Sequence, residues 1–336
     1  MKKLLALSIA AVLSLCSVQA DTITLNSSGS TFIAPINGRW FSEYNKLHPD
    51  VQINYQSVGS GQGIKSFVGG LTDFGASDAA MSDADIASVK DGGVVLLPMT
   101  AGSIVLSYNL PGVTGTVQLP RDVYPAIFLG EITKWNDPKI VAANPGLTLP
   151  DLPITVAYRA DGSGTTFVFS NHLAAISPEF KTKVGSGKAV KWPVGVGGKG
   201  NEGVSALIKQ TAGTIGYVEY GYAQQIKLPM AALQNQAGKF VAPTPESGST
   251  ALSQVDLPAN LRAFVHDPTG DASYPIVTFS WWLCHTTYTK PGAADAIKAL
   301  ATWCLTDGQK LAPELGYLPL PDSVVAKVQA AVSTIK

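Results

Sequence analysis

Charged residues are scarce in this sequence. They make up 14% of its 336 residues, and the formal net charge is zero at pH 7. Without an excess of either sign, the chain lacks the electrostatic attraction that nucleic acids or acidic membrane surfaces require, so we expect neither as a partner. Any anion that this protein binds must therefore be held by a local group of donors.

Cysteine and histidine are also few. The sequence has three cysteines and four histidines, none of them in the spacing of a zinc site, so we expect no metal and no cofactor. Cys16 lies in the first twenty residues, which leaves Cys284 and Cys304. Their spacing leaves both a disulfide and two free thiols open, because sequence separation does not fix the distance between the Cα atoms.

Long apolar runs are absent apart from residues 4–15, which are too few to span a bilayer. Two lysines precede this run, and the small-residue sequence Val18-Gln19-Ala20 follows it. This pattern predicts a secretory signal peptide over residues 1–20. We expect an exported, soluble chain that begins at Asp21 and, having lost two lysines, carries a net charge of about −2.

Glycine and proline, by contrast, are abundant. Their counts of 33 and 22 are typical of many short elements joined by turns. Short β-like runs alternate with helical patterns, which favours an α/β fold. The expected strands are 22–25, 51–55, 73–78, 154–158 and 276–284, and the expected helices are 32–47, 64–68, 165–176, one starting at 82 and one after 321.

Small polar residues gather at three of the expected strand-to-helix junctions. The segments are Ser30-Thr31-Phe32, Gly59-Ser60-Gly61 and Gly162-Ser163-Gly164-Thr165. The first N–H groups of a helix lack internal partners and carry the positive end of the helix dipole, so such a junction attracts an anion. The alternative is that each Ser or Thr only caps its helix. Three such junctions together favour an anion site.

One arginine and two carboxylates accompany these junctions. Arg159 offers a forked set of donors to an oxyanion, or else forms an ordinary ion pair with Asp161. Asp78 either caps a helix or turn, or faces the anion. A carboxylate repels an anion unless that anion carries a proton for it to accept, as phosphate does near neutral pH and sulfate does not. Asp78 therefore predicts selection of phosphate over sulfate.

Six motifs in this sequence carry a resemblance to a known family: 29–35, 59–64, 73–78, 159–167, 197–201 and 213–220. They closely resemble those of the periplasmic phosphate-binding protein of ABC-type phosphate uptake systems. The resemblance spans nearly the whole mature chain, in order, and it implies the type II periplasmic binding protein fold: two α/β lobes, joined by crossing strands, that close on a ligand.

The resemblance also implies a set of ligands and partners. Asp161 would hold Arg159, and Phe32 would contribute its backbone N–H. We expect a monomer in the periplasm that binds inorganic phosphate and delivers it to the membrane permease and ATPase components of the transporter. The expected division is lobe I over 21–100 and 275–336, and lobe II over 101–274. The implied phosphate ligands are Thr31, Phe32, Ser60, Asp78, Arg159, Ser163, Gly164 and Thr165.

Other functions are weighed against this one. A receptor for sulfate or molybdate with the same fold is opposed by Asp78, and a scaffold or adhesion protein would keep the fold without a ligand. Gly195 to Gly200 match the dinucleotide-binding pattern G-x-G-x-x-G, but Pro193 interrupts the strand that should precede it, so we expect a loop followed by a helix. With no G-x-S-x-G elbow and no evident histidine base, we expect no enzyme.

Overall fold

The computed structural model describes residues 22–90 and 93–336. The predicted signal peptide, including Cys16, and the predicted first mature residue Asp21 lie outside the described residues. Within the described ranges, no helix has the length and apolar character needed to cross a membrane.

An eight-stranded mixed sheet organises the chain, with strand order β2-β1-β3-β11-β4-β8-β6-β7. β1 is parallel to β2 and β3, β6 is parallel to β7 and β8, and β11 and β4 are antiparallel to their neighbours. A smaller sheet has the order β10-β9-β5. The strands are β1 Ile23–Gly29, β2 Val51–Ser57, β3 Phe74–Ser77, β4 Val94–Tyr108, β5 Gln118–Leu119, β6 Thr155–Arg159, β7 Val196–Gly198, β8 Thr214–Glu219, β9 Ala232–Gln234, β10 Phe240–Val241 and β11 Val277–His285.

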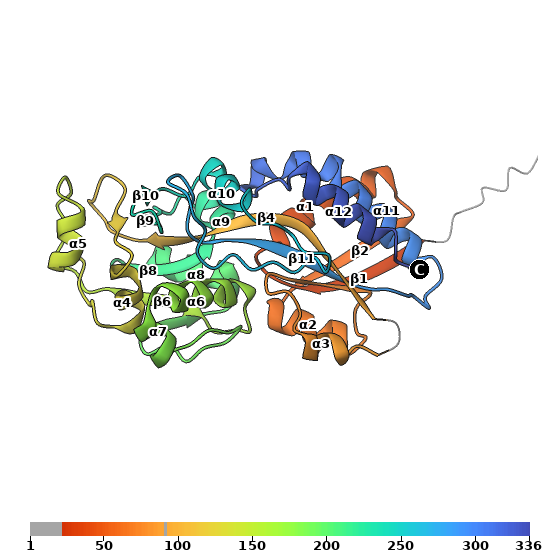
Figure 1. Ribbon diagram of the computed structural model, residues 1–336, viewed down its shortest axis with the longest axis horizontal. Coiled ribbons are helices and arrows are strands. Elements are labelled where there is room, and N and C mark those ends of the chain that lie inside the picture. The colour runs from red at the N-terminus through yellow and green to blue at the C-terminus, as the bar shows by residue number, and fades with distance from the viewer. Residues whose placement is uncertain (1–21, 91–92) are drawn as a thin grey trace, which may run out of the picture.

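Strand β4 joins two halves of this sheet. Residues 94–103 of β4 pair with β11, and residues 104–108 pair with β8. We call β2, β1, β3 and their helices the β1 side, and β8, β6, β7 and their helices the β6 side. Figure 1 shows the two sides at opposite ends of an elongated molecule, with β4 and β11 running between them. The expected lobe boundary at residue 100 falls inside β4, and the division into lobes stays a prediction.

Helices flank the sheet on each side. Figure 1 places α1, α11 and α12 above the β1 side and α2 and α3 below it, while α4, α6 and α7 lie at the β6 side. Two 3-10 turns, 307–311 and 313–315, follow α11. The helices are α1 Ala34–Leu47, α2 Ser60–Val68, α3 Asp83–Ala87, α4 Val123–Leu129, α5 Pro138–Ala143, α6 Gly164–Ile176, α7 Pro178–Lys183, α8 Gly200–Gln210, α9 Tyr220–Gln225, α10 Pro245–Leu252, α11 Ala293–Leu305 and α12 Asp322–Val332.

The expected elements are present with small shifts at their ends. In α1, Pro35 lies in the first turn, and Ile36, Trp40 and Tyr44 are buried on one face, as the spacing predicts. Leu47, expected on that face, is 63% exposed because it ends the helix beyond the last packed turn. Similar buried spacing brings α12 against the core.

The structure decides two expectations from the sequence: a loop after Gly195, and a possible disulfide between Cys284 and Cys304. The segment after Gly195 is not a loop but the short edge strand β7, paired with β6. Gly198 is needed there for packing, since a Cβ would lie 2.7 Å from the backbone of Gly203 in α8.

Cys284 in β11 and Cys304 in α11 are both buried and free, so the disulfide is not formed.

Candidate anion-binding site

The predicted site residues meet where the β1 side faces the β6 side. Ser60 opens α2, and Gly164 opens α6. A Cβ added to Gly164 would lie 2.6 Å from Asp78 Oδ2, which places the start of α6 directly against that carboxylate. The Gly61 N–H donates to the Gly162 carbonyl across the same junction (2.8 Å). Residues expected from separate segments therefore lie in close contact at one place.

Asp78 is held by hydroxyl groups. It follows β3 directly and is 1% exposed. Ser30 Oγ donates to both carboxylate oxygens (2.6 Å each), Ser280 Oγ donates to Oδ1 (2.7 Å), and Ser60 Oγ donates to Oδ2 (3.3 Å). The alternative role as a helix cap is wrong, because the next helix, α3, is capped by Ser82. Among the described residues no cation forms an ion pair with Asp78.

Burial sets the titration of this carboxyl group. It raises the pKa of Asp78 from its ordinary value of 3.8 to about 6, against the opposing effects of the Ser30 and Ser280 hydroxyls and the charge of Arg159. At neutral pH, Asp78 is therefore ionised and accepts hydrogen bonds. A group that brings its own hydrogen would be stabilised beside it, and a group that brings only lone pairs would be repelled.

Arg159 is the cation of the site. It ends β6, and its side chain is 1% exposed. Its Nε and Nη2 donate to the two oxygens of Asp161 (2.8 and 2.6 Å), a bidentate pair, while Nη1 donates to Thr165 Oγ1 (3.2 Å). Burial opposes ionisation of Asp161, but the hydrogen bonds and charge of Arg159 outweigh it, so the pKa of Asp161 is lowered.

The first turn of α6 contributes backbone donors. Ser163 Oγ caps the helix by accepting from the Thr166 N–H (3.0 Å), so the capping role holds for this serine. Ser60 and Thr31 do not cap the helices that they precede or open. The N–H groups of Gly164 and Thr165 make no hydrogen bond to another described residue, and they sit at the positive end of a thirteen-residue helix.

Thr31 and Phe32 approach from the start of α1. Thr31 Oγ1 accepts from the Asn201 side chain on the β6 side (2.9 Å), which joins it to the rest of the site. The Phe32 N–H donates to Ser30 Oγ (2.9 Å), and its ring is buried against Tyr317. The expected Phe32 donor therefore already has a partner within the protein.

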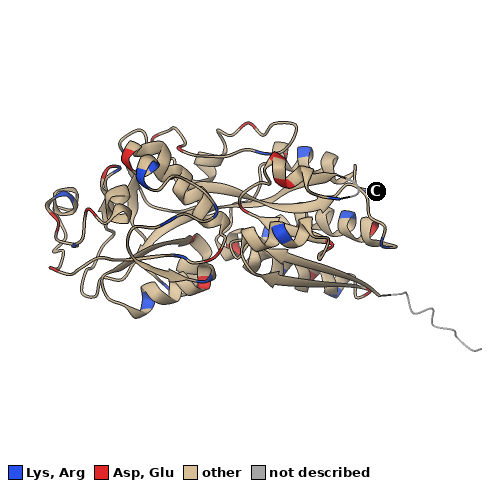
Figure 2. Ribbon diagram, turned by 90° about the horizontal axis from the view of Figure 1, so that it is seen from below, with Lys and Arg blue, Asp and Glu red and all other residues tan. Residues whose placement is uncertain are grey.

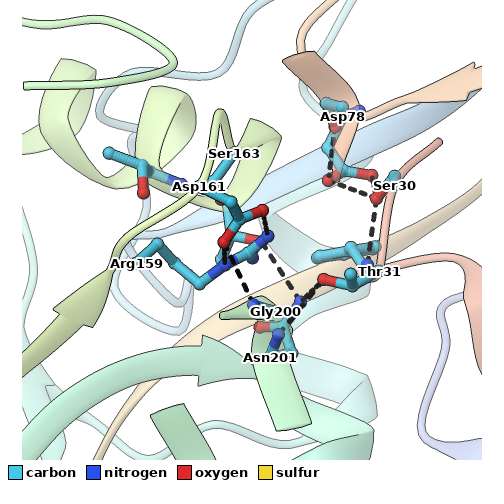
Figure 3. Close-up of polar contacts among 12 residues, drawn as sticks. Ser30, Thr31, Asp78, Arg159, Asp161, Ser163, Gly200 and Asn201 are labelled. Atoms are coloured by element: carbon cyan, nitrogen blue, oxygen red, sulfur yellow. Dashed lines mark hydrogen bonds and ion pairs between the residues drawn. The ribbon is translucent and has the colours of Figure 1, made fainter. Parts of the chain in front are cut away.

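Three contributors were missed at the level of sequence. Ser30 was noted only as part of a junction, Asn201 only as the end of a motif, and Ser280 not at all. Figure 3 shows Ser30 beside Asp78, and Asn201 below Arg159 and Thr31. A sequence signal exists for Asn201, a buried amide in the first turn of a helix, but none marks Ser280, which lies 202 residues from Asp78.

The charge that could hold an anion is local. In Figure 2, Lys and Arg alternate with Asp and Glu over both ends of the molecule rather than gathering on one face. Within the described ranges, no three His, Cys, Asp or Glu side chains are placed to hold a metal ion. The site therefore combines the paired guanidinium of Arg159, helix-start amides and hydroxyls with the buried carboxylate of Asp78.

A two-sided mixed α/β sheet with such a cluster of polar groups at its junction defines a type II periplasmic binding protein. The sequence pattern of the PBP superfamily domain matches residues 17–307. Among solved structures, the chain resembles the high-affinity periplasmic phosphate-binding protein PfluDING (TM-score 0.75, 19% identity, 92% of this chain and 93% of that one) and the phosphate-binding protein of Stenotrophomonas maltophilia (TM-score 0.75, 18% identity, 92% and 93%). The expected fold class is confirmed.

Curated relatives narrow the class to a family. The chain is 42% identical over 321 residues to the phosphate-binding protein PstS of Pasteurella multocida, covering 95% of this chain and 92% of the relative. It is 40% identical to PstS of Methanocaldococcus jannaschii, covering 94% and 87%. The chain belongs to the PstS family of phosphate-binding proteins.

Proposed function

We propose that this protein binds inorganic phosphate in the periplasm and delivers it to the membrane permease and ATPase components of an ABC-type phosphate importer. The PstS relatives support the ligand, and the predicted signal peptide supports the compartment. A binding protein, rather than an enzyme, also suits the histidines: among the described residues none of them hydrogen-bonds to the site, and buried His172 pairs instead with Tyr124 (2.8 Å).

The observation that carries the proposal is the buried carboxylate of Asp78 facing the start of α6. Near neutral pH, phosphate bears at least one proton that an ionised Asp78 accepts. Sulfate bears none, so its oxygen would meet the carboxylate with lone pair against lone pair and charge against charge. A site made only of donors would not make this distinction.

The remaining ligands supply donors to the other oxygens. Arg159 would use the guanidinium N–H groups not directed at Asp161, and the first turn of α6 would use its backbone amides. Phe32 would bind through its N–H only if that group left Ser30 Oγ. The proposed ligands are Thr31, Phe32, Ser60, Asp78, Arg159, Ser163, Gly164 and Thr165, with Asp161 holding Arg159 in place.

Binding would couple to closure of the two sides. The contacts between Gly61 and Gly162, and between Thr31 and Asn201, join the β1 side to the β6 side, so they belong to a closed arrangement. Opening would separate these pairs by a hinge motion along β4 and β11. If about ten hydrogen bonds form at about 1.5–3 kcal/mol for the charge-assisted ones, most of the sum offsets dehydration and closure, leaving micromolar or tighter affinity, about −8 kcal/mol or below.

Titration calorimetry of the mature protein with phosphate, arsenate and sulfate tests this proposal. We expect strong heats with phosphate and arsenate, which both carry a proton, and binding of sulfate weaker by about a hundredfold or more. No heat with phosphate would favour a scaffold that only keeps the fold. Equal affinities for phosphate and sulfate would remove the role assigned to Asp78.

A further inference from the structure

Asn201 occupies a central position that the proposed ligand set does not use. It is the second residue of α8 and is fully buried. Its Oδ1 accepts from the Glu219 backbone N–H (3.0 Å), a group that can only donate. The amide orientation is therefore fixed by β8, and Nδ2 must face the other way, toward the two threonines of the site.

The hydrogen bonds at Thr31 decide where its hydroxyl hydrogen points. Thr31 Oγ1 accepts from Asn201 Nδ2 (2.9 Å) and from the Asn201 backbone N–H (3.2 Å). A hydroxyl oxygen has two lone pairs and one hydrogen. Because both lone pairs are engaged, the hydroxyl can act toward any third group only as a donor, and it donates to no acceptor among the described residues.

Thr165 is placed in the same way from the other side. Its Oγ1 accepts from Arg159 Nη1 (3.2 Å) and from Asn201 Nδ2 (3.3 Å). Its hydrogen too is left for a third group. One amide thus sets two hydroxyls, one from each side of the molecule, in the donor state that an anion requires.

We propose that Asn201 is the positioning residue that fixes the hydroxyls of Thr31 and Thr165 as donors to the anion, and that it does so fully only when the two sides meet. The inference rests on the proposed function. Asn201 belongs to the β6 side and Thr31 to the β1 side, so its two bonds to Thr31 form on closure. The hydroxyl of Thr31 is then oriented as a donor at the same moment as the two sides close on each other.

Neighbouring contacts strengthen this arrangement. Tyr222 in α9 donates its hydroxyl to the Thr31 carbonyl (2.7 Å). Glu219, whose backbone orients the Asn201 amide, also caps α9 by accepting from the Gly221 and Tyr222 N–H groups (2.8 and 3.2 Å). Thr31 is therefore held at its side chain and its backbone by two elements that share Glu219.

The test measures phosphate binding by calorimetry in the wild type, Asn201→Ala and Asn201→Asp. Asn201→Ala removes the side-chain bonds to both hydroxyls and leaves Thr31 only the backbone N–H of residue 201. Both hydroxyls are then freer to rotate, so we expect affinity to fall by about tenfold to a hundredfold. Asn201→Asp keeps the shape but accepts the hydroxyl hydrogens and adds negative charge, so we expect a larger loss than for Ala. A role in packing alone would give the opposite order.

A double-mutant cycle separates positioning from a general effect on the fold. In the Thr31→Val background one of the two oriented hydroxyls is gone, so Asn201→Ala should cost clearly less affinity than it does in the wild type. Asn144→Ala is the matched control: this buried amide bonds to Gln118 and Ile140, away from the site, so its loss should lower Tm and leave phosphate affinity within about twofold.

The outcomes also distinguish the inference from the function on which it rests. A wild type that gives no heat with phosphate overturns both. A wild type that binds phosphate, together with Asn201→Ala and Asn201→Asp variants that bind it equally well, overturns only the role of Asn201. Equal losses from Asn201→Ala with and without the Thr31 hydroxyl would also reject it.

Discussion

Two carboxylates of the same site are stabilised in opposite ways. Asp161 is paired with a guanidinium by two short hydrogen bonds, and its pKa is lowered. Asp78 is surrounded by serine hydroxyls and forms no ion pair within residues 22–90 and 93–336, and its pKa is raised to about 6. Both aspartates lie near Arg159. Asp161 forms an ion pair with it, whereas the charge of Asp78 is not paired with a cation among the described residues.

The difference separates two tasks. The Arg159–Asp161 pair fixes the direction of a buried cation whose Nη1 reaches Thr165, so it contributes attraction for any oxyanion. Three serine hydroxyls supply three hydrogens to the carboxylate of Asp78, which has about four lone-pair sites. Asp78 therefore remains an acceptor and contributes discrimination. Attraction and selectivity thus reside on opposite sides of the molecule, and each can be perturbed separately.

The largest expected effect comes from removing the cation. Arg159→Met deletes the main donor and leaves the partly buried Asp161 without its partner, so phosphate affinity should fall on the order of a thousandfold in calorimetry. The control is Arg121→Met, which breaks a similar pair with Asp267 (2.8 Å) elsewhere on the chain and should leave affinity unchanged. Comparable losses of affinity in the two variants would mean that breaking either ion pair weakens binding by destabilising the fold, and not by removing a phosphate donor.

The next largest effect should come from blocking the close approach of Gly164, at the start of α6, to Asp78. In Gly164→Ala the added Cβ would meet Asp78 Oδ2 at 2.6 Å, so the start of α6 can no longer approach Asp78. We expect phosphate affinity to fall by about a hundredfold, with a smaller change in Tm. Gly38→Ala, whose Cβ meets nothing within 4 Å, is the control. Unchanged binding by Gly164→Ala would show that the approach is not needed.

Removing the charge of Asp78 should change the preference for phosphate over sulfate more than it changes the affinity for phosphate. Asp78→Asn keeps the shape and presents an amide that can donate, so the ratio of phosphate to sulfate affinity should fall by about tenfold or more. Calorimetry with both anions measures it. Asp73→Asn, which removes a charge paired with Lys290 at the surface, should keep the wild-type ratio. A ratio unaffected by Asp78→Asn would contradict the proton-based mechanism.

Lowering the pH should have the same effect on the wild type as Asp78→Asn, because it protonates Asp78. As the pH falls from about 7 to about 5, through the pKa of Asp78 near 6, the carboxyl becomes protonated and can donate to sulfate. Sulfate affinity should rise by about tenfold over this range. The lowered pKa of Asp161 keeps the arginine pair intact meanwhile. Asp78→Asn should show no such rise, and the same pH dependence in the variant would assign it to another group.

The smallest effect is on stability. The folded-state pKa of Asp78 lies above its ordinary value, so the ligand-free fold holds this proton better than the unfolded chain does. The contribution to stability is full below about pH 4 and is lost as the pH rises to about 6. Relative to Asp78→Asn, the wild-type Tm should drop by about 2 to 4 °C across that window. Parallel Tm curves would contradict the assigned pKa.

The sequence predicted the parts of the site that depend on local pattern. Gly162 to Thr165 could be placed at a helix start because strand and helix signals flank them, and Asp78 could be interpreted because a carboxylate among anion donors needs a chemical reason. Leu47 shows the limit of periodicity: it keeps the helical spacing of α1 but ends outside the packed core, which only the tertiary structure decides.

The contacts made over long distances in the chain could not be predicted. Ser280 reaches Asp78 because β11 returns between β3 and β4, a topology that no local signal in the sequence gives. Asn201 lies in a recognised motif, yet its role depends on Thr31, 170 residues earlier. The same holds for the thiols, since burial in neighbouring elements did not bring Cys284 and Cys304 into a bond.

Those two thiols provide a chemical reporter of core opening. Burial raises the pKa of Cys284 to about 12 and that of Cys304 well above its ordinary value, and only the thiolate reacts with alkylating reagents. In the native state at neutral pH, both should resist modification. Because Cys284 lies in β11 opposite β3 and Cys304 lies in α11, the rate of their alkylation measures how often the β1 side unfolds locally, with no label introduced into the protein.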